Sequence, residues 1–272
     1  MTNPSPMTTD RSPLAGDAFS SGLQSRSIAR KRAPTKAGHL IAFTLLVALG
    51  GIAHAEQPPT LSPATTAAQA NLVDIRTLVP DIAEDIKYAG RDNFVGAPVD
   101  GYLAPKCLLL RPVAEALARV EHELRPQHLR LKIWDCYRPA HAVAHFVRWA
   151  HDLDDQRTKP QHYPTLDKSQ LLGDYIAPVS GHSRGATIDL TMQRCAPDGT
   201  HCTPLDMGTD FDFFDVRAHT EAPGITAAQH ANRALLRDAM AREGFRNYPL
   251  EWWHYTLTPE PTPHTLYDVP VQ

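Results

Sequence analysis

Apolar residues recur along the chain with two different periods. Spacings of three and four residues are typical of helices with one buried face, and they predict helices at 112–124, 140–153 and 226–243. Alternation predicts strands at 127–135 and 187–191. Two adjacent tryptophans and the following Tyr-Thr-Leu favour a strand at 252–257, and an early strand or edge segment is expected at 71–78. Turn formers fill 92–102, and 155–173 has the polar, proline-rich composition of a long loop with one short helix. Four residues of the last helix are expected to point inward: Ala234, Leu235, Met240 and Ala241.

The N-terminal part carries a different pattern. Residues 40–52 are apolar, follow four basic residues and precede the small-residue site Ala53-His54-Ala55, which is typical of a secretory signal. Thirteen residues are too few to span a membrane comfortably. We therefore expect a signal peptide with a long lead at 1–55, a linker at 56–71 and one catalytic domain at 72–272. An uncleaved anchor and a wrongly chosen start remain alternatives.

Charge narrows the range of partners. The chain has 272 residues, of which 42% are hydrophobic, enough for a sizeable core. Removing the six basic and two acidic residues of 1–55 leaves 21 basic and 28 acidic residues, a formal net charge of −7. Nucleic acid is not expected as a partner, because phosphate binding needs clustered positive charge. We expect a periplasmic protein without stable membrane association after signal cleavage.

The four cysteines all follow the expected cleavage site, and an even count suits an oxidising compartment. Cys195 and Cys202 flank the turn-rich segment APDGTH, so we expect them to be bridged, which pairs Cys107 with Cys136. A cysteine metal site or a catalytic thiol is the alternative. The chain contains no C-x-x-C pair that would favour it.

Two segments contain candidate metal ligands. In SGHSRGATIDLT, residues 180–191, His182 lies on an expected turn and Asp189 on the polar face of an expected half-buried strand. In EWWHY, residues 251–255, His254 lies on an expected strand and Glu251 on the loop that enters it. Two imidazoles and one carboxylate with an open position are the arrangement that catalytic zinc uses. Glu251 would then be free to act as a base. Ordinary core histidines and salt bridges are the alternative.

Arg138 lies at the corner between an expected strand and helix, in WDCYRP at 134–139. Such corners often face a cleft, where a guanidinium can stabilise negative charge that develops during a reaction. The alternative is that Arg138 only pairs with Asp135.

These motifs, together with KYAGRDNFVGAPVDGY and MGTDFDFFD, occur in an order and at separations that resemble the D-alanyl-D-alanine dipeptidases of the vancomycin-resistance type. The resemblance runs from about Lys87 to the C-terminus. It implies a zinc peptidase with an α+β fold, in which a small central antiparallel sheet carries one zinc ion and helices pack outside. Its zinc ligands would be His182, Asp189 and His254, with Glu251 as the base and Arg138 steadying the transition state.

The resemblance also implies groups that hold the charged ends of a dipeptide: Ser180, Asp212, Tyr88 and Tyr102. The implied activity is hydrolysis of D-alanyl-D-alanine in cell-wall precursor turnover. A D,D-carboxypeptidase or endopeptidase acting on longer peptidoglycan stems is the alternative enzyme. A non-catalytic zinc-bearing module is a third hypothesis, which Glu251 and Arg138 argue against. Asp210 departs from the pattern beside the site, and the signal and cysteines indicate an exported relative.

Overall fold

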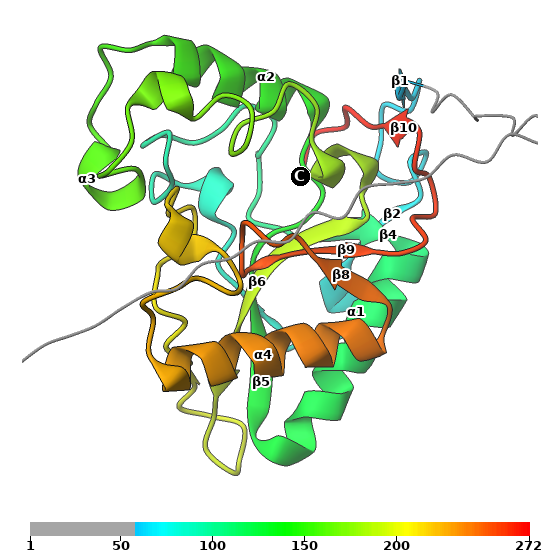
Figure 1. Ribbon diagram of the computed structural model, residues 1–272. Coiled ribbons are helices and arrows are strands. Elements are labelled where there is room, and N and C mark those ends of the chain that lie inside the picture. Colours follow the sequence, from blue (N-terminus) through cyan, green and yellow to red (C-terminus); the bar gives the residue numbers. More distant parts are fainter. Residues whose placement is uncertain (1–57) are drawn as a thin grey trace, which may run out of the picture. The chain divides into compact units, whose positions relative to one another are not determined.

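The computed structural model describes residues 58–272, so the expected signal peptide lies outside the described residues (Figure 1). Four α-helices are present in this part of the chain: α1 Arg111–Leu124, α2 Ala140–His151, α3 Lys159–His162 and α4 Ala227–Arg242. The strands are β1 Thr60–Leu61, β2 Leu72–Asp74, β3 Ala83–Glu84, β4 Leu108–Leu110, β5 Leu129–Asp135, β6 Thr187–Arg194, β7 Thr203–Pro204, β8 Phe245–Asn247, β9 His254–Leu257 and β10 Thr265–Leu266. The α+β class that was expected is confirmed.

A six-stranded sheet forms the centre, with the order β3-β5-β6-β9-β8 and with β7 paired to β6. Its middle pairs, β5 with β6 and β6 with β9, are antiparallel. At one edge β3 runs parallel to β5, so the sheet is mixed, and the expected antiparallel arrangement holds for its other pairs but not for this edge. The chain between β3 and β5 contains α1, and a parallel pair needs such a crossover connection.

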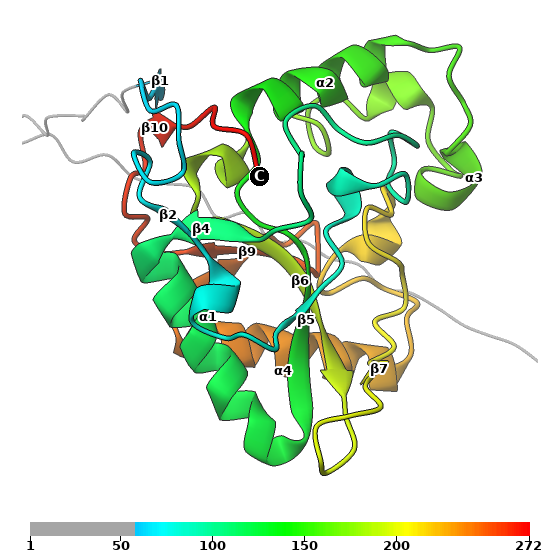
Figure 2. The same ribbon diagram turned by 180° about the vertical axis from the view of Figure 1, so that it is seen from behind.

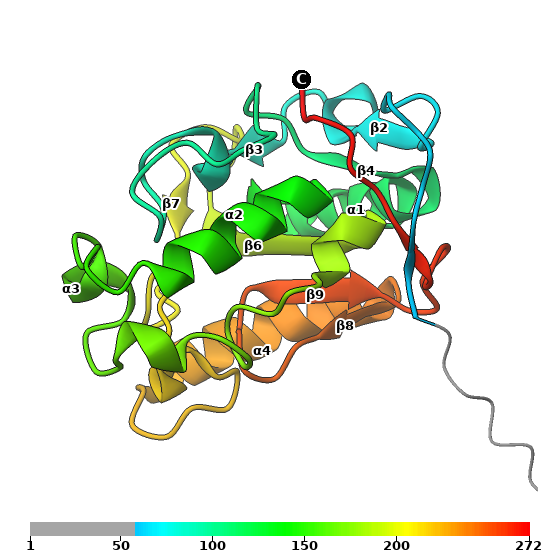
Figure 3. The ribbon, with the colours of Figure 1, turned by 90° about the horizontal axis from the view of Figure 1, so that it is seen from above.

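Helices cover both sides of this sheet (Figures 1 and 2). α1 and α4 contact each other on one side, while α2 lies on the other, as the view from above also shows (Figure 3). The apolar face of α1 is fully buried through Val113, Leu117 and Leu124. Full burial of such a side chain contributes about 1.5 to 3 kcal/mol, so this face anchors α1.

Two details of the pattern were predicted wrongly. β6 was expected to be half-buried, but its polar residues Thr187, Asp189 and Thr191 are at most 2% exposed, because β6 lies between β5 and β9 and both of its faces are covered. Of the four α4 residues expected to point inward, Met240 is buried, Ala234 and Leu235 are only partly buried, and Ala241 is exposed. The buried face of α4 is formed by Arg233, Leu236, Ala239 and Met240. Arg233 points inward because its guanidinium donates to the carbonyls of Met207, Arg217 and His219.

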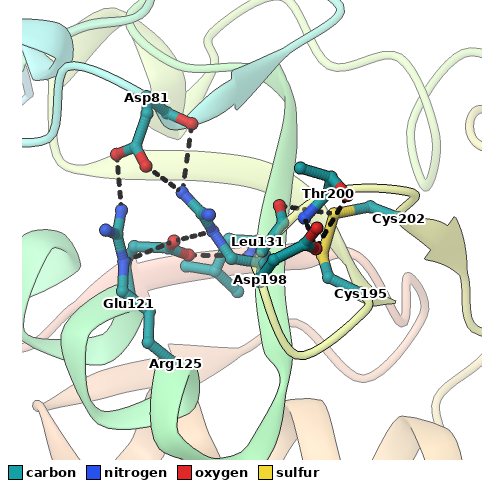
Figure 4. The surroundings of a disulfide bond; sticks show 10 residues. Asp81, Glu121, Arg125, Leu131, Cys195, Asp198, Thr200 and Cys202 are labelled. Carbon is teal, nitrogen blue, oxygen red and sulfur yellow. Dashed lines mark hydrogen bonds and ion pairs between the residues drawn. A yellow bond between two sulfur atoms is a disulfide. The ribbon is translucent and has the colours of Figure 1, made fainter.

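Two disulfides join the cysteines in the expected pairs, Cys107 with Cys136 and Cys195 with Cys202. The first ties the residue before β4 to the residue after β5, and both of its cysteines are buried. The second closes a surface loop after β6 (Figure 4). Between residues 58 and 272, no helix is long and apolar enough to cross a membrane.

Candidate metal centre

His182, Asp189 and His254 meet at one end of the sheet. One ligand atom from each lies within 4.8 Å of the others. His182 Nε2 lies 3.2 Å from Asp189 Oδ2 and 3.3 Å from His254 Nδ1, and His254 Nδ1 lies 3.0 Å from Asp189 Oδ1. The three residues come from a 3₁₀ helix at Gly181–Arg184, from β6 and from the first position of β9.

The local sequence explains how His182 and Asp189 reach the same point. The Ser180 side chain accepts a hydrogen bond from His182 N and caps the 3₁₀ helix, which ends at Gly185 with φ +71°. A side chain at Gly185 would be strained in this conformation, and its Cβ would approach the Leu72 side chain to 2.9 Å. The turn reverses the chain, so that β6 can start at Thr187 and present Asp189 beside His182.

The ring of His182 has a defined proton position. Its Nδ1 lies 2.7 Å from the backbone oxygen of Cys136. Because a carbonyl can only accept, Nδ1 carries the proton and Nε2 is left with a free lone pair. Burial lowers the pKa of His182, which favours this neutral form. Metal-binding histidines are commonly oriented in this way by a carbonyl behind the ring.

Asp189 supports the same interpretation. Its buried Oδ1 lies 3.0 Å from His254 Nδ1 without the geometry of a hydrogen bond, and a buried carboxylate oxygen that lacks a donor is costly. Burial would raise the pKa of Asp189, but the neighbouring imidazoles of His182 and His254 lower it below its ordinary value. The carboxylate is therefore anionic. Two imidazole nitrogens and an anionic carboxylate oxygen that converge on one point fit a divalent metal ion.

Glu251 lies on the segment that enters β9, as the sequence predicted. β9 begins at His254, two residues later than the strand expected at 252–257. Its Oε2 lies 3.3 Å from His254 Nδ1, so both side chains reach the same side although they are three residues apart. Burial raises the pKa of Glu251 to about 7, and the charge of Asp189 adds to the shift. A carboxyl group with a pKa near neutrality can both accept and release a proton there.

Arg138 follows β5. It pairs with Asp135, as one hypothesis had it, and it also faces a cavity, as the hypothesis of a role in charge stabilisation requires. Its Nε and Nη2 donate to Asp135 Oδ2 at 3.0 and 2.8 Å, while its guanidinium lies 5.0 Å from the ring centroid of Tyr88 and 4.9 Å from that of Phe146. The same side chain lines the cavity beside the three candidate ligands. The pair with Asp135 thus holds a cation at the cavity wall.

The cavity beside the ligands has a volume of about 300 Å³. Three of the four candidate substrate-binding residues line it: Ser180, Asp212 and Tyr88. Tyr102 lies outside this lining, because it is buried and its hydroxyl donates to Asp135 Oδ1 at 2.6 Å. Asp210 also lies away from the site and lines a separate hollow with Trp134.

Asp212 is a buried carboxylate in the cavity wall. The Tyr88 hydroxyl donates to its two oxygens, at 3.2 and 3.0 Å. Burial, together with the charge of Asp189, raises the pKa of Asp212 well above its ordinary value. A cation bound against Asp212 would restore its charged form, so the carboxylate favours a positively charged group in the cavity.

Comparison with known proteins gives the family. The family model described as D-ala-D-ala dipeptidase, Peptidase_M15, matches residues 68–272. The chain belongs to this D-Ala-D-Ala dipeptidase family. The chain is similar to the D-alanyl-D-alanine dipeptidase of Streptomyces coelicolor, with 42% identity over 71% of this chain and 95% of the relative.

Two further relatives of the chain are also named D-alanyl-D-alanine dipeptidase. The D-alanyl-D-alanine dipeptidase of Enterococcus faecium is 41% identical over 72% of this chain and 95% of its own length. That of Escherichia coli is 34% identical over 68% of this chain and 84% of its own length. A solved D,D-pentapeptidase, VanY with Zn(II), has a TM-score of 0.34 at 14% identity over 57% of this chain and 76% of its own. That likeness is too low to carry an argument.

Sequence reasoning missed several residues of this dipeptidase-family site. Tyr248 contacts the His254 ring edge to face, with ring centroids 5.6 Å apart, and lines the cavity. Val143 and Phe146 reach the cavity from α2. No motif marks these residues, although Tyr248 precedes Glu251 by only three positions. Asp135 was considered only as a partner of Arg138, whereas it also accepts a hydrogen bond from the Tyr102 hydroxyl.

Proposed function

We propose that the protein is a zinc-dependent peptidase that hydrolyses free D-alanyl-D-alanine. The observation that carries the proposal is one cavity that combines the convergent group His182, Asp189 and His254 with the carboxylates Glu251 and Asp212. Membership of the family, with relatives that bear the name D-alanyl-D-alanine dipeptidase, supports the substrate.

The residues that would hold zinc are His182, Asp189 and His254, which leave a fourth position open. When bound, zinc supplies a Lewis acid and makes a water molecule more acidic. The tautomer of His182, set by the Cys136 carbonyl, offers Nε2 as a ligand without prior loss of a proton. This pre-orientation supports binding of a metal that prefers neutral imidazole and carboxylate donors.

Glu251 is the group that moves protons. With a pKa raised to about 7 it can take a proton from the attacking water and pass it to the amine that leaves. Such proton transfer is worth roughly 100- to 10,000-fold in rate. As water attacks, negative charge grows on the former carbonyl oxygen. Arg138, held at the cavity wall by Asp135, stabilises this charge more than the neutral ground state.

Asp212 provides the preference for a free amine. Its buried carboxylate can pair with the ammonium end of a dipeptide, which acylation would remove. The carboxylate would then stay buried without a cationic partner, at a loss of roughly 1 to 3 kcal/mol. The cavity volume of about 300 Å³ also suits a small peptide. These features favour the dipeptidase over a carboxypeptidase that acts on longer stems.

We further propose export to the periplasm, with the signal at 1–55 removed. The two disulfides support an oxidising compartment. There the enzyme would remove or recycle a fragment of cell-wall precursor. Detection of protein that begins after Ala55 in a periplasmic fraction tests this part of the proposal. Retention of the whole chain in the membrane fraction would instead indicate an uncleaved anchor.

The activity is tested with a substrate panel on the purified protein, with and without chelator. D-alanyl-D-alanine should be hydrolysed, its N-acetyl form and a pentapeptide stem that ends in the same two residues should react far more slowly, and chelation should stop turnover. Comparable rates on all three substrates would favour the carboxypeptidase. Metal analysis of His182→Ala/His254→Ala completes the test, because full zinc content in this variant would refute the ligand assignment.

A further inference from the structure

His162, the last residue of α3, contacts the backbone on both sides of Phe213. Its ring Nδ1 lies 2.9 Å from the carbonyl oxygen of Asp212, and its own carbonyl accepts a hydrogen bond from Phe214 N at 2.7 Å. Because the Asp212 carbonyl can only accept, the His162 ring must donate from Nδ1. Burial lowers the pKa of His162, which is consistent with a neutral ring in this tautomer.

Asp212 has an unusual backbone conformation, with φ +54°. This left-handed region is unfavourable for residues other than glycine, although aspartate tolerates it better than most. Such conformations persist where the surroundings hold them, and they occur often at functional sites. Glycine would adopt the conformation freely but would lack the carboxylate. The two contacts with His162 hold the backbone at this position.

α3 is itself anchored to the body of the domain. Tyr163, the next residue, is fully buried with its ring centroid 5.8 Å from that of Trp149 on α2. At the other end of α3, the Thr158 hydroxyl donates to the Phe94 carbonyl at 2.6 Å. Phe94 and Phe214 both line the cavity. His162 therefore connects Asp212 to a helix that is fixed at both ends.

We propose that His162 is a positioning residue for Asp212. It holds the left-handed backbone so that the Asp212 carboxylate, supported from the other side by the Tyr88 hydroxyl, points into the cavity toward the substrate ammonium. The inference rests on the proposed function, since it assigns to His162 an indirect part in the selection of a free amine. His162 is not among the residues that line the cavity, so its part would be indirect.

The first test compares His162→Phe with His162→Asn. Phenylalanine fills the space without a donor, whereas the asparagine amide nitrogen takes the place of Nδ1 and can still donate to the Asp212 carbonyl. We expect H162F to lower kcat/KM for D-alanyl-D-alanine about tenfold, mostly through KM, and to leave the slow N-acetyl reaction unchanged. H162N should stay within about twofold of the wild type. His151→Phe, at an exposed histidine on the end of α2, is the matched control.

The second test is a double-mutant cycle. If His162 acts through the Asp212 carboxylate, H162F should cause no further loss in an Asp212→Asn background, whereas independent effects would multiply. Equal losses on the free and acylated substrates, failure of H162N to restore activity, or multiplied losses in the double variant would each overturn the proposal. Urea denaturation of all variants identifies any loss that comes from unfolding.

The tautomer can be measured without substrate. ¹⁵N-edited NMR of the labelled histidines should show His162 protonated at Nδ1, and a proton at Nε2 instead would overturn the proposal. A wild-type protein that does not hydrolyse D-alanyl-D-alanine refutes the proposed function separately. In that event the tautomer still decides whether His162 holds the Asp212 backbone.

Discussion

Glu121 and Glu251 are both carboxylates that the fold removes from solvent, but their surroundings differ. Glu121, on α1, has a side-chain exposure of 0%, and its oxygens accept from Arg125 Nε at 3.2 Å, Arg130 Nε at 2.9 Å and Leu131 N at 2.8 Å. The same two arginines hold Asp81, and their hydrogen bonds lower its pKa to about 2 (Figure 4). Every charge in this network has a partner of opposite charge.

Glu251 has a side-chain exposure of 13%, and within residues 58–272 its carboxylate pairs only with His254, at 3.3 Å. The pKa values of Glu251 and Asp212 are both raised by burial, and Asp189 keeps an oxygen that accepts no hydrogen bond. A buried charge that is fully paired holds the fold together, whereas buried carboxylates without sufficient partners are available for metal, substrate and protons. The difference separates a structural network from a functional one.

The largest effect is expected from Glu251→Gln. The amide cannot accept the proton of water, so kcat for D-alanyl-D-alanine should fall roughly 100- to 10,000-fold. Zinc content, measured by metal analysis, should remain at one ion per chain, because Glu251 is not a proposed ligand. Loss of zinc from this variant would show that Glu251 is a ligand and not a base.

Glu121→Gln should instead lower stability and leave catalysis unchanged. It removes the negative charge beneath Arg125 and Arg130 and should lower the free energy of unfolding by about 3 kcal/mol, as measured in urea, with kcat unchanged in the folded protein. Glu123→Gln on the same helix is the control, because its exposed pair with Arg242 is worth less than about 1 kcal/mol. A large fall in kcat for Glu121→Gln would remove the distinction between the two networks.

Glu84 on β3 provides an intermediate case. Its side chain is 2% exposed, its one ion partner among residues 58–272 is Arg76 at 3.2 Å, and burial raises its pKa from 4.5 to about 7. The folded state thus binds a proton more tightly than the unfolded state, and stability should fall as the pH rises from 4.5 to 7. The contribution is at most about 3 kcal/mol. Urea unfolding of Glu84→Gln should lose this part of the pH dependence, and an unchanged slope would contradict the assignment.

The smallest effect is expected from removal of each of the two disulfides, compared by zinc affinity. Replacing Cys107 and Cys136 by serine should weaken zinc binding about tenfold in a chelator competition, because the Cys136 carbonyl orients His182. Cys195→Ser/Cys202→Ser should leave zinc affinity unchanged, since that bridge closes a loop beside the Glu121 network (Figure 4). Equal zinc affinity in both double variants would show that the backbone holds Cys136 without the bridge.

The strongest periodic patterns predicted their elements well. The helix expected at 112–124 is α1 at Arg111–Leu124, that at 140–153 is α2 at Ala140–His151, and that at 226–243 is α4 at Ala227–Arg242. Each has several turns whose apolar spacing is repeated, so one or two ambiguous residues do not change the pattern. The two-residue strands β1, β3, β7 and β10 were not predicted, because pairs of residues carry no period.

The candidate site could be predicted in part. The motifs grouped His182, Asp189, His254 and Glu251, and the fold brings their side chains together. The placement of Tyr102 in the substrate site is not what the structure has, since the hydroxyl is directed to Asp135. Tyr88 and Tyr102 belong to the same motif, and in the sequence their side chains are chemically identical. Only the packing around each decides which of them faces the cavity.

The sequence by itself determined the α+β class, the main helices and strands, and the residue types that can bind a metal and move a proton, because these depend on periodicity and on side-chain chemistry. The tertiary structure alone decided the parallel edge strand, the inward face of α4 and the partners of Tyr102, Asp135 and His162. His162 contacts Asp212 from 50 residues away. No local pattern records such a contact, since it exists only after the chain has packed.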